Sequence, residues 1–200
     1  MPIIAGRASA AYGAGFSRAV TAAVPLVGSF DALGTVTVPS GGLSSITFAG
    51  IPQTGYSHLQ VRAIARSTAA QNFYGPRMRV GSSTIDSGSN YALHQLYGTG
   101  SAAAASAGVS NTEMYATTGP AANDTANSFG VIVVDILDYA NTNKYKTARF
   151  LGGTDLNGSG YIHLNSGLWM NTSAISQIQF FPSGGNFAEY SQFALYGVKA

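Results

Sequence analysis

The chain has 200 residues, of which 46% are hydrophobic and only 9% are charged, and its formal net charge is +2. This length suits one domain with a full hydrophobic core, and no apolar stretch reaches the roughly 18–20 residues of a transmembrane helix. Ten Lys and Arg residues without a dense basic run argue against nucleic-acid binding, and the lack of Cys excludes disulfides and thiolate metal sites.

The first predicted element in chain order is an N-terminal arm, residues 1–34. It is rich in Ala and Gly and has neither a strand nor a helix period, as in AGRASAAYGAGFSRAV from Ala5. Such a segment buries little apolar surface by itself and becomes ordered only against a partner. We therefore expect residues 35–200 to form the folded domain.

From Thr35 onward, short runs rich in Val, Ile, Phe, Tyr and Thr alternate with turns of Gly, Pro, Asn and Ser. The run HLQVRAIAR from His58 alternates strictly and places every second residue from Leu59 to Ala65 on one face. No segment has a long helical period. This pattern predicts an all-β fold, an antiparallel β-sandwich or barrel, with strands within residues 35–38, 45–50, 58–66, 77–81, 90–98, 112–117, 129–137, 144–152, 161–169, 176–181 and 191–198.

Two further stretches depart from simple alternation. The sequence GTGSAAAASAGVSN from Gly98 is of low complexity and predicts a long surface loop. The sequence VIVVDIL from Val131 has apolar residues at both odd and even positions, which predicts a strand covered on both faces. Because a sandwich core covers only one face, we expect another subunit to cover the other.

The arginines are the first candidates for ligand binding. Arg62 and Arg66 are predicted to share one face of a strand, and Arg77 and Arg79 one face of another. A basic cluster of this kind could bind an anionic polysaccharide or a partner protein, but four arginines also commonly anchor loops and subunit contacts. The tyrosines and Trp169 could likewise stack on sugars, although aromatic residues in strands usually belong to a core or an interface.

Acid–base catalysis has little support in the sequence. Asp135 and Asp138 are three residues apart, so in a strand they point to opposite faces, and Asp138 is expected to form an ion pair with Lys144 or Lys146 across a hairpin. The two glutamates are isolated in the sequence, and a glycosidase needs two acids across a cleft. His58, His94 and His163 lie far apart and are expected to be strand residues with hydrogen-bonded rings.

The stretch DLNGSG from Asp155 has two interpretations. Asp155, Asn157 and Ser159 occupy the first oxygen positions of a calcium loop, which makes them candidate metal ligands. However, the twelfth position is Ser166 where such a loop has Glu, and one carboxylate is a poor site for a divalent cation. Asn157 and Gly158 both tolerate positive φ, so a tight hairpin turn is the favoured interpretation, and no metal or cofactor is expected.

A resemblance adds to these inferences. It is carried by SSITFAGIPQTGYSHLQVRAIARS from Ser44, by FGVIVVDILDYANTNKYKTARFLGGTDLNGSG from Phe129, and by GLWMNTSAISQIQFFPSGG from Gly167 leading into SQFALYGVKA. Together these stretches cover most of the chain after Thr35. They resemble a family of virion structural proteins of tailed bacteriophages, frequent in phages of cyanobacteria and other aquatic bacteria.

The resemblance implies a non-enzymatic sandwich of jelly-roll type, displayed on the virion surface and commonly trimeric. It supplies no catalytic residue, and its N-terminal part serves attachment, which in this chain assigns virion docking to Arg7, Tyr12, Phe16 and Arg18. The expected function is an exposed fibre or fibre-tip protein that contributes to host adsorption. The alternatives are a capsid decoration protein and, more remotely, a polysaccharide depolymerase. Expected partners are further copies of the chain as a homotrimer, other virion proteins and host surface polysaccharide.

Overall fold

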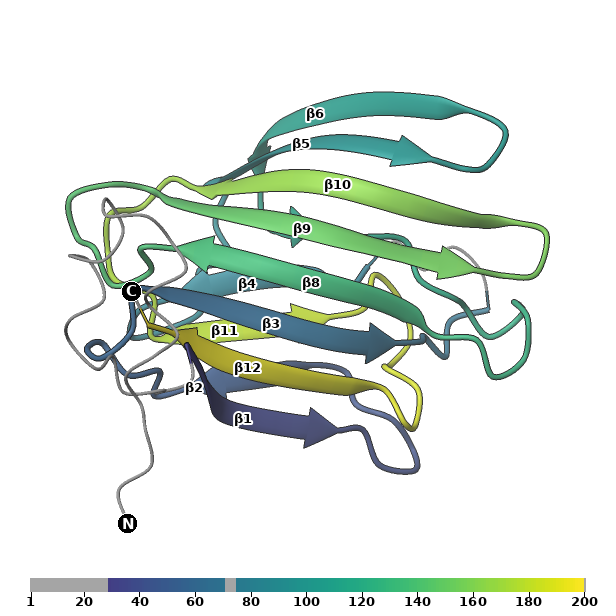
Figure 1. Cartoon of the computed structure of the whole chain (residues 1–200), viewed down its shortest axis with the longest axis horizontal. Coiled ribbons are helices and arrows are strands. Elements are labelled where there is room, and N and C mark those ends of the chain that lie inside the picture. Colours follow the sequence, from purple (N-terminus) through teal and green to yellow (C-terminus); the bar gives the residue numbers. More distant parts are fainter. Residues whose placement is uncertain (1–28, 71–74, 200) are drawn as a thin grey trace, which may run out of the picture.

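The chain forms two antiparallel β-sheets that pack face to face, as the computed structural model describes for residues 29–70 and 75–199 (Figure 1). Turns and loops join the strands, and no helix occurs in this described part. The strands are β1 (Phe30–Thr37), β2 (Ile46–Ala49), β3 (His58–Ala65), β4 (Arg77–Gly81), β5 (Tyr91–Gly98), β6 (Ala103–Asn111), β7 (Met114–Tyr115), β8 (Gly130–Leu137), β9 (Lys146–Asp155), β10 (Gly160–Trp169), β11 (Gln177–Phe181) and β12 (Gln192–Val198).

The larger sheet has eight strands in the order β1-β12-β3-β8-β9-β10-β5-β6, and the smaller has four in the order β2-β11-β4-β7. Neighbouring strands pair antiparallel in both sheets. The predicted antiparallel β-sandwich is thus confirmed, while the jelly-roll type stays a prediction. Within residues 29–70 and 75–199, no helix is long and apolar enough to cross a membrane.

The hydrophobic core lies between the two sheets. Every second residue of β3 from Leu59 to Ala65 is buried there, as the alternation in the sequence predicts. From the smaller sheet, Ile178 and Phe180 of β11 are fully buried against the same core. Full burial contributes roughly 1.5–3 kcal/mol for each large apolar side chain, so this core is the main source of stability.

The folded domain begins earlier than residue 35, and the predicted boundary after residue 34 falls inside a strand. β1 starts at Phe30 and pairs with β12. Its register shifts between Ala32 and Gly34, and such an irregularity disturbs the alternation by which a strand is recognised in a sequence.

The prediction of a long surface loop at residues 98–111 is wrong, because most of this stretch forms β6. The strand pairs with β5 and is joined to it by a turn in which the Thr99 N–H donates to the Ala102 carbonyl at 2.9 Å. Ala and Ser have low β propensity, so the backbone ladder to β5 determines the conformation and the side chains do not. Nearly every residue of β6 is exposed, since it is an edge strand with neither face covered.

The two sheets differ in width, and the difference creates a concave surface. The smaller sheet ends at β7, a strand of two residues that packs against β10 and β5. β6 and the adjoining ends of β5 and β10 continue beyond β7, at the top of Figure 1. Their inner faces are therefore not covered by the smaller sheet, and residues of β5 and β10 form one wall of a cleft there.

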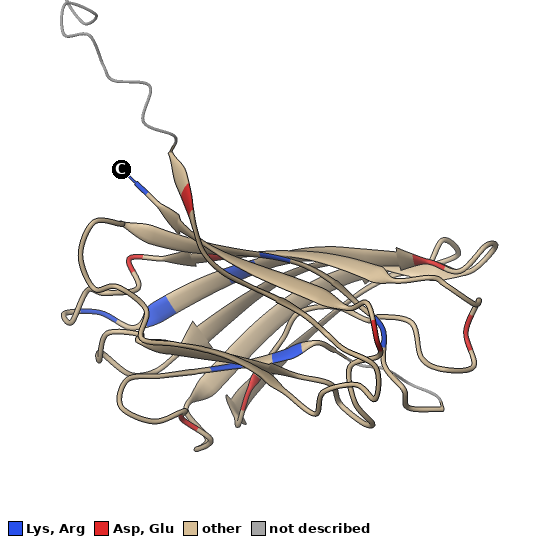
Figure 2. Ribbon diagram, turned by 90° about the horizontal axis from the view of Figure 1, so that it is seen from below, with Lys and Arg blue, Asp and Glu red and all other residues tan. Residues whose placement is uncertain are grey.

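The outer face of the larger sheet carries an apolar row across four neighbouring strands. Val133 of β8 pairs with Leu151 of β9, Leu151 with Leu164 of β10, and Leu164 with Leu96 of β5. The three leucines are 52%, 49% and 55% exposed, respectively. We call these four residues the outer apolar strip. Charged residues are sparse along the whole ribbon, as Figure 2 shows.

The structure explains one of the two apolar faces of β8. Its inner residues Ile132, Val134 and Ile136 are buried in the core. On the outer face, Val131 is 55% and Leu137 is 50% exposed in the single chain. The cover on this second face, which we expect from another subunit, stays a prediction.

Candidate binding site

A cleft of about 520 Å³ opens where the larger sheet extends beyond β7. We call it the inner-face cleft. Gln95 and three threonine side chains contribute to its lining, and none of its lining residues is an Asp or a Glu. The residues that determine its character are Arg77, Tyr97, Tyr115, Tyr161, His163 and Asn165.

His163 lies on the floor of the inner-face cleft. Its side chain points inward from β10 and only 7% of the residue is exposed. The imidazole stacks on the Tyr97 ring, with ring centroids 5.4 Å apart and an interplanar angle of 17°, and the Tyr161 ring lies 5.9 Å away at a tilt. Burial lowers the pKa of His163, so the ring is neutral at pH 7.

Both ring nitrogens of His163 are buried and have no hydrogen-bond partner in the described part of the chain. The sequence-based expectation of a hydrogen-bonded ring is therefore wrong for this histidine. The backbone pairing explains the outcome, because the register of β10 with β5 and β9 fixes which side chains face inward, whatever their polarity.

Asn165, two residues further along β10, lies beside His163 on the floor of the cleft and is 2% exposed. Its Nδ2 donates to the carbonyl oxygens of Tyr115 and Ala116, both at 3.1 Å. These two bonds anchor the amide to the C-terminal end of β7 and leave Oδ1 as the unused acceptor. That Oδ1 is buried and has no partner among the described residues.

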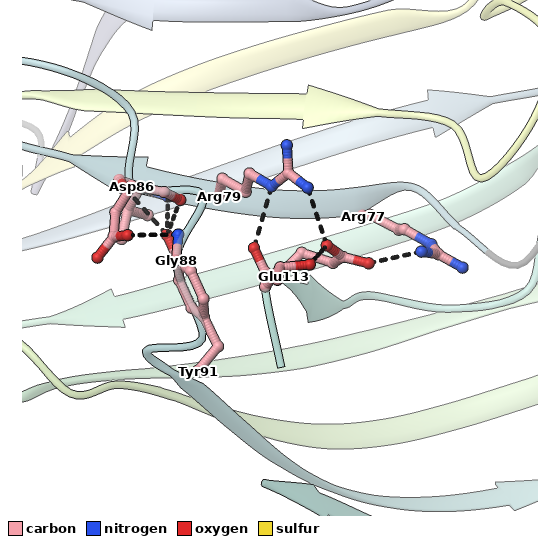
Figure 3. Close-up of polar contacts among 8 residues, drawn as sticks. Arg77, Arg79, Asp86, Gly88, Tyr91 and Glu113 are labelled. Carbon is pink, nitrogen blue, oxygen red and sulfur yellow. Dashed lines mark hydrogen bonds and ion pairs between the residues drawn. The ribbon is translucent and has the colours of Figure 1, made fainter. Parts of the chain in front are cut away.

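The rim of the cleft next to β4 carries an ion-pair cluster (Figure 3). Glu113 accepts from Arg77 Nη1 at 2.5 Å and from Arg79 Nη2 at 3.0 Å, and it also accepts from the Thr112 hydroxyl. Burial alone would raise the pKa of Glu113, but the hydrogen bonds from Thr112 and Arg79 and the two guanidinium charges outweigh it and lower the pKa. The single carboxylate of Glu113 thus offsets one of the two positive charges in this cluster.

Next to this cluster, Asp86 organises a buried aromatic pair. It accepts from Trp169 Nε1 at 2.8 Å through Oδ2. Its carbonyl accepts from the Tyr91 hydroxyl at 2.8 Å, as Figure 3 shows. Trp169 is 1% exposed and belongs to the core. Trp169 therefore offers no exposed ring for a ligand to stack on, in agreement with the core alternative considered from the sequence.

The structure does not bring the four predicted arginines together. Arg62 lies on the outer face of the larger sheet, where its Nε donates to Gln60 Oε1 at 2.8 Å. Arg77 and Arg79 lie on the other side of the sandwich, pointing away from the core on β4. Of the four, Arg77 alone lines the inner-face cleft.

Arg66 holds a loop. It follows the last residue of β3, and its guanidinium donates five hydrogen bonds of 2.8–3.2 Å to oxygens within residues 122–128. Each bond satisfies an acceptor of the loop that leads into β8, which is the anchoring role considered as the alternative to ligand binding.

The aspartates of β8 are separate, as the sequence predicts. Asp135 accepts from Gln60 Nε2 at 2.8 Å and from Arg149 Nη2 at 2.7 Å on the outer face. Asp138 lies in the following turn and forms an ion pair with Lys144, which confirms the predicted pairing. The two carboxylates thus do not converge on a common site.

The stretch DLNGSG forms the predicted hairpin turn. β9 ends at Asp155 and β10 begins at Gly160, and the Leu156 N–H donates to the Ser159 carbonyl at 2.8 Å. Asn157 and Gly158 have φ of 62° and 107°, so the positive φ expected for both is confirmed. Asp155 Oδ1 accepts from the Asn157 N–H at 2.8 Å, which uses one oxygen of the proposed calcium ligand within the turn.

The sequence also offered candidate metal ligands and candidate docking residues. Within the described ranges, no group of three or more His, Cys, Asp or Glu side chains could hold a metal ion. The predicted docking residues lie outside the described residues, so their role stays a prediction; they are Arg7, Tyr12, Phe16 and Arg18.

Comparison of the chain with protein-family models, with curated proteins and with solved structures found no match. The function is therefore inferred from the geometry of the inner-face cleft together with the resemblance in the sequence. The sequence analysis did not single out the residues on the cleft floor. The signal that could have found them is the alternation of the apolar residues Ile162 and Leu164 with the polar residues His163 and Asn165.

Proposed function

We propose that the chain is a non-enzymatic virion structural protein of a tailed bacteriophage, an exposed fibre or fibre-tip protein that contributes to host adsorption. The observation that supports this function best is the inner-face cleft, which combines tyrosine, amide, imidazole and hydroxyl groups and has no carboxylate in its lining. Such a lining suits recognition by hydrogen bonds and ring contacts. The resemblance to phage virion proteins supplies the biological setting.

The acidic side chains near the sheets support binding over turnover. Burial raises the pKa of Asp86, Glu113 and Asp135, but hydrogen bonds, joined by arginine charges at Glu113 and Asp135, outweigh it, and the pKa of each carboxyl is lowered. These groups are ionised at neutral pH and engaged with structural partners. General acid catalysis needs the opposite, a carboxyl whose pKa is raised towards neutrality.

Assembly is the second part of the proposal. The four residues of the outer apolar strip are uncharged and its three leucines are about half exposed in the single chain, and exposed apolar surface of this kind marks contacts between proteins. We expect a second and a third copy of the chain to cover it in a homotrimer, as the doubly apolar sequence of β8 predicts. Repetition of a weak binding site on one particle raises the overall avidity by roughly 10²–10⁴ when several sites engage together.

The same strip favours a second candidate, a capsid decoration protein. In that case the strip would be covered by capsid subunits, and the inner-face cleft would have no role in adsorption. The two candidates place the chain at different positions on the particle, so they differ in a measurable way.

A cryo-electron microscopy map of the virion that carries this chain tests the proposal. We expect density for the sandwich on tail fibres or their tips, with the inner-face cleft open to solvent. Density at three-fold or quasi-three-fold positions of the capsid would overturn the fibre assignment in favour of the decoration protein. Absence of the chain from the particle would overturn both.

A further inference from the structure

We propose that the inner-face cleft binds an uncharged sugar residue of a surface glycan through Asn165 and His163 on its floor. This inference rests on the proposed function, because adsorption requires a ligand on the host surface, and it specifies the class of that ligand. It differs from the anionic polysaccharide considered for the arginine cluster.

The first reason is the unused acceptor of Asn165. Its Nδ2 already donates to two backbone carbonyls, so Oδ1 can be satisfied only by a hydrogen-bond donor. A buried polar atom without a partner costs about 1–3 kcal/mol, and a ligand that supplies the donor recovers this free energy. A sugar hydroxyl is such a donor, whereas an ionised carboxylate, sulfate or phosphate is not.

The second reason is the neutral ring of His163. A neutral imidazole has one N–H donor and one acceptor nitrogen, and both nitrogens here lack partners among the described residues. A hydroxyl group both donates and accepts, so it can pair with either nitrogen. Asn165 and His163 together thus present two acceptors and one donor, a set that hydroxyl-rich ligands match.

The charge and the walls of the cleft agree with a neutral ligand. Arg77 on the rim is already engaged, because it is ion-paired with Glu113, which it shares with Arg79, and it lies 4.9 Å from the centroid of the Tyr115 ring. Tyr97 and Tyr161 supply amphipathic rings beside the polar floor, suited to the C–H faces and the hydroxyls of a sugar. The volume of about 520 Å³ lies in the usual range for small-molecule sites, roughly 300–1,000 Å³.

Access to the floor involves the tyrosines. The unpartnered atoms of His163 and Asn165 are buried, and the rings of Tyr97 and Tyr161 lie against the imidazole of His163. Tyr161 is 38% exposed, and side-chain rotamer changes of this kind are common when a ligand binds. We therefore expect Tyr161 to shift when a sugar hydroxyl reaches His163.

The test is a titration of the full-length protein, followed by the imidazole NMR signals of His163 and by saturation-transfer difference NMR. The neutral probes are glucose, galactose, mannose and N-acetylglucosamine, and the anionic probe is glucuronic acid. We expect at least one neutral sugar to bind at millimolar concentrations and to shift the His163 signals, and glucuronic acid to bind more weakly. Binding of none of the four neutral sugars, or tighter binding of glucuronic acid, would overturn the inference.

The variant His163→Phe keeps a planar ring and removes both nitrogens. We expect the Kd for the bound sugar to rise about tenfold or more, while the thermal unfolding temperature stays the same or increases because two unpartnered buried nitrogens are lost. His94→Phe makes the same replacement on the outer face of β5 and should leave the Kd unchanged. An unchanged Kd in His163→Phe would contradict the inference, and if this variant does not fold, the wild-type shift of His163 decides alone.

Failure of the sugar site and failure of the proposed function give different results. If no sugar binds but the purified protein still competes with phage adsorption, the ligand class is wrong and the adsorption function stands. If sugars bind but the protein does not affect adsorption, the cleft inference stands and the adsorption function fails.

Discussion

Among single residues, Glu113 links the rim of the inner-face cleft to pH. Its lowered pKa means that the charged form is favoured by folding. The stabilisation is therefore fully present above the unfolded-state pKa of about 4.5 and is lost as the pH falls through the lower folded-state value. We expect Glu113→Gln to lower the free energy of unfolding at pH 7 by about 1–3 kcal/mol, since hydrogen bonds to charged groups are lost.

Urea unfolding at pH 7, 5, 4 and 3 measures this effect. The difference between wild type and Glu113→Gln should shrink below pH 4.5, because the wild-type carboxyl then becomes protonated. The exposed turn residue Asp155 offers a matched control, and Asp155→Asn should change stability by less than about 0.5 kcal/mol. A Glu113→Gln difference that does not depend on pH would show that the ion pairs contribute nothing.

Single residues also show where prediction from the sequence stopped. In β3 the apolar residues face the core, so the alternation predicts burial correctly. In β10 the alternation is reversed at its beginning, since Ile162 and Leu164 are 63% and 49% exposed while the floor residues His163 and Asn165 face inward. Hydrophobicity alone would place the leucine inside and the asparagine outside. The register of β10 with β5 and β9 decides the matter, and pairing between distant strands is not visible in one sequence.

At the scale of elements, the strands with β-branched and aromatic residues could be located from the sequence, and the two misassigned segments share a cause. β6 consists largely of Ala, Ser and Gly, and β1 contains Asp31 and Gly34 among its first five residues, so neither has the composition of a strand. Both are edge strands of the larger sheet. An edge strand receives its conformation from one neighbour, and that neighbour is far away in the sequence for β1.

The outer apolar strip depends on four strands, because its four residues line up only through the pairing of β8, β9, β10 and β5. We predict that the free protein sediments as a trimer at micromolar concentration, and that Leu164→Glu at the strip converts it to a monomer by burying a charge in the interface. Gln192→Glu, on the same face but outside the strip, should leave the trimer intact. Sedimentation velocity measures all three proteins, and a wild-type monomer at this concentration would contradict the prediction.

At the scale of the whole molecule, unequal sheets give the sandwich two different surfaces. The outer face of the larger sheet carries the outer apolar strip, and its inner face forms the cleft where the smaller sheet ends. The proposed assembly surface and the proposed ligand site thus lie on opposite sides of the same sheet. One face can be buried in an oligomer while the other stays open, which is what a multivalent adsorption protein requires.

Inhibition of phage adsorption by the purified protein tests the central claim most directly. The rate of phage adsorption to host cells is measured with increasing concentrations of the wild-type protein, and with His163→Phe as the variant altered in the cleft. The account predicts that wild-type protein slows adsorption in a saturable manner and that His163→Phe does so at least about tenfold less effectively. An adsorption rate that stays unchanged at saturating concentrations of the wild-type protein would contradict a role in host recognition.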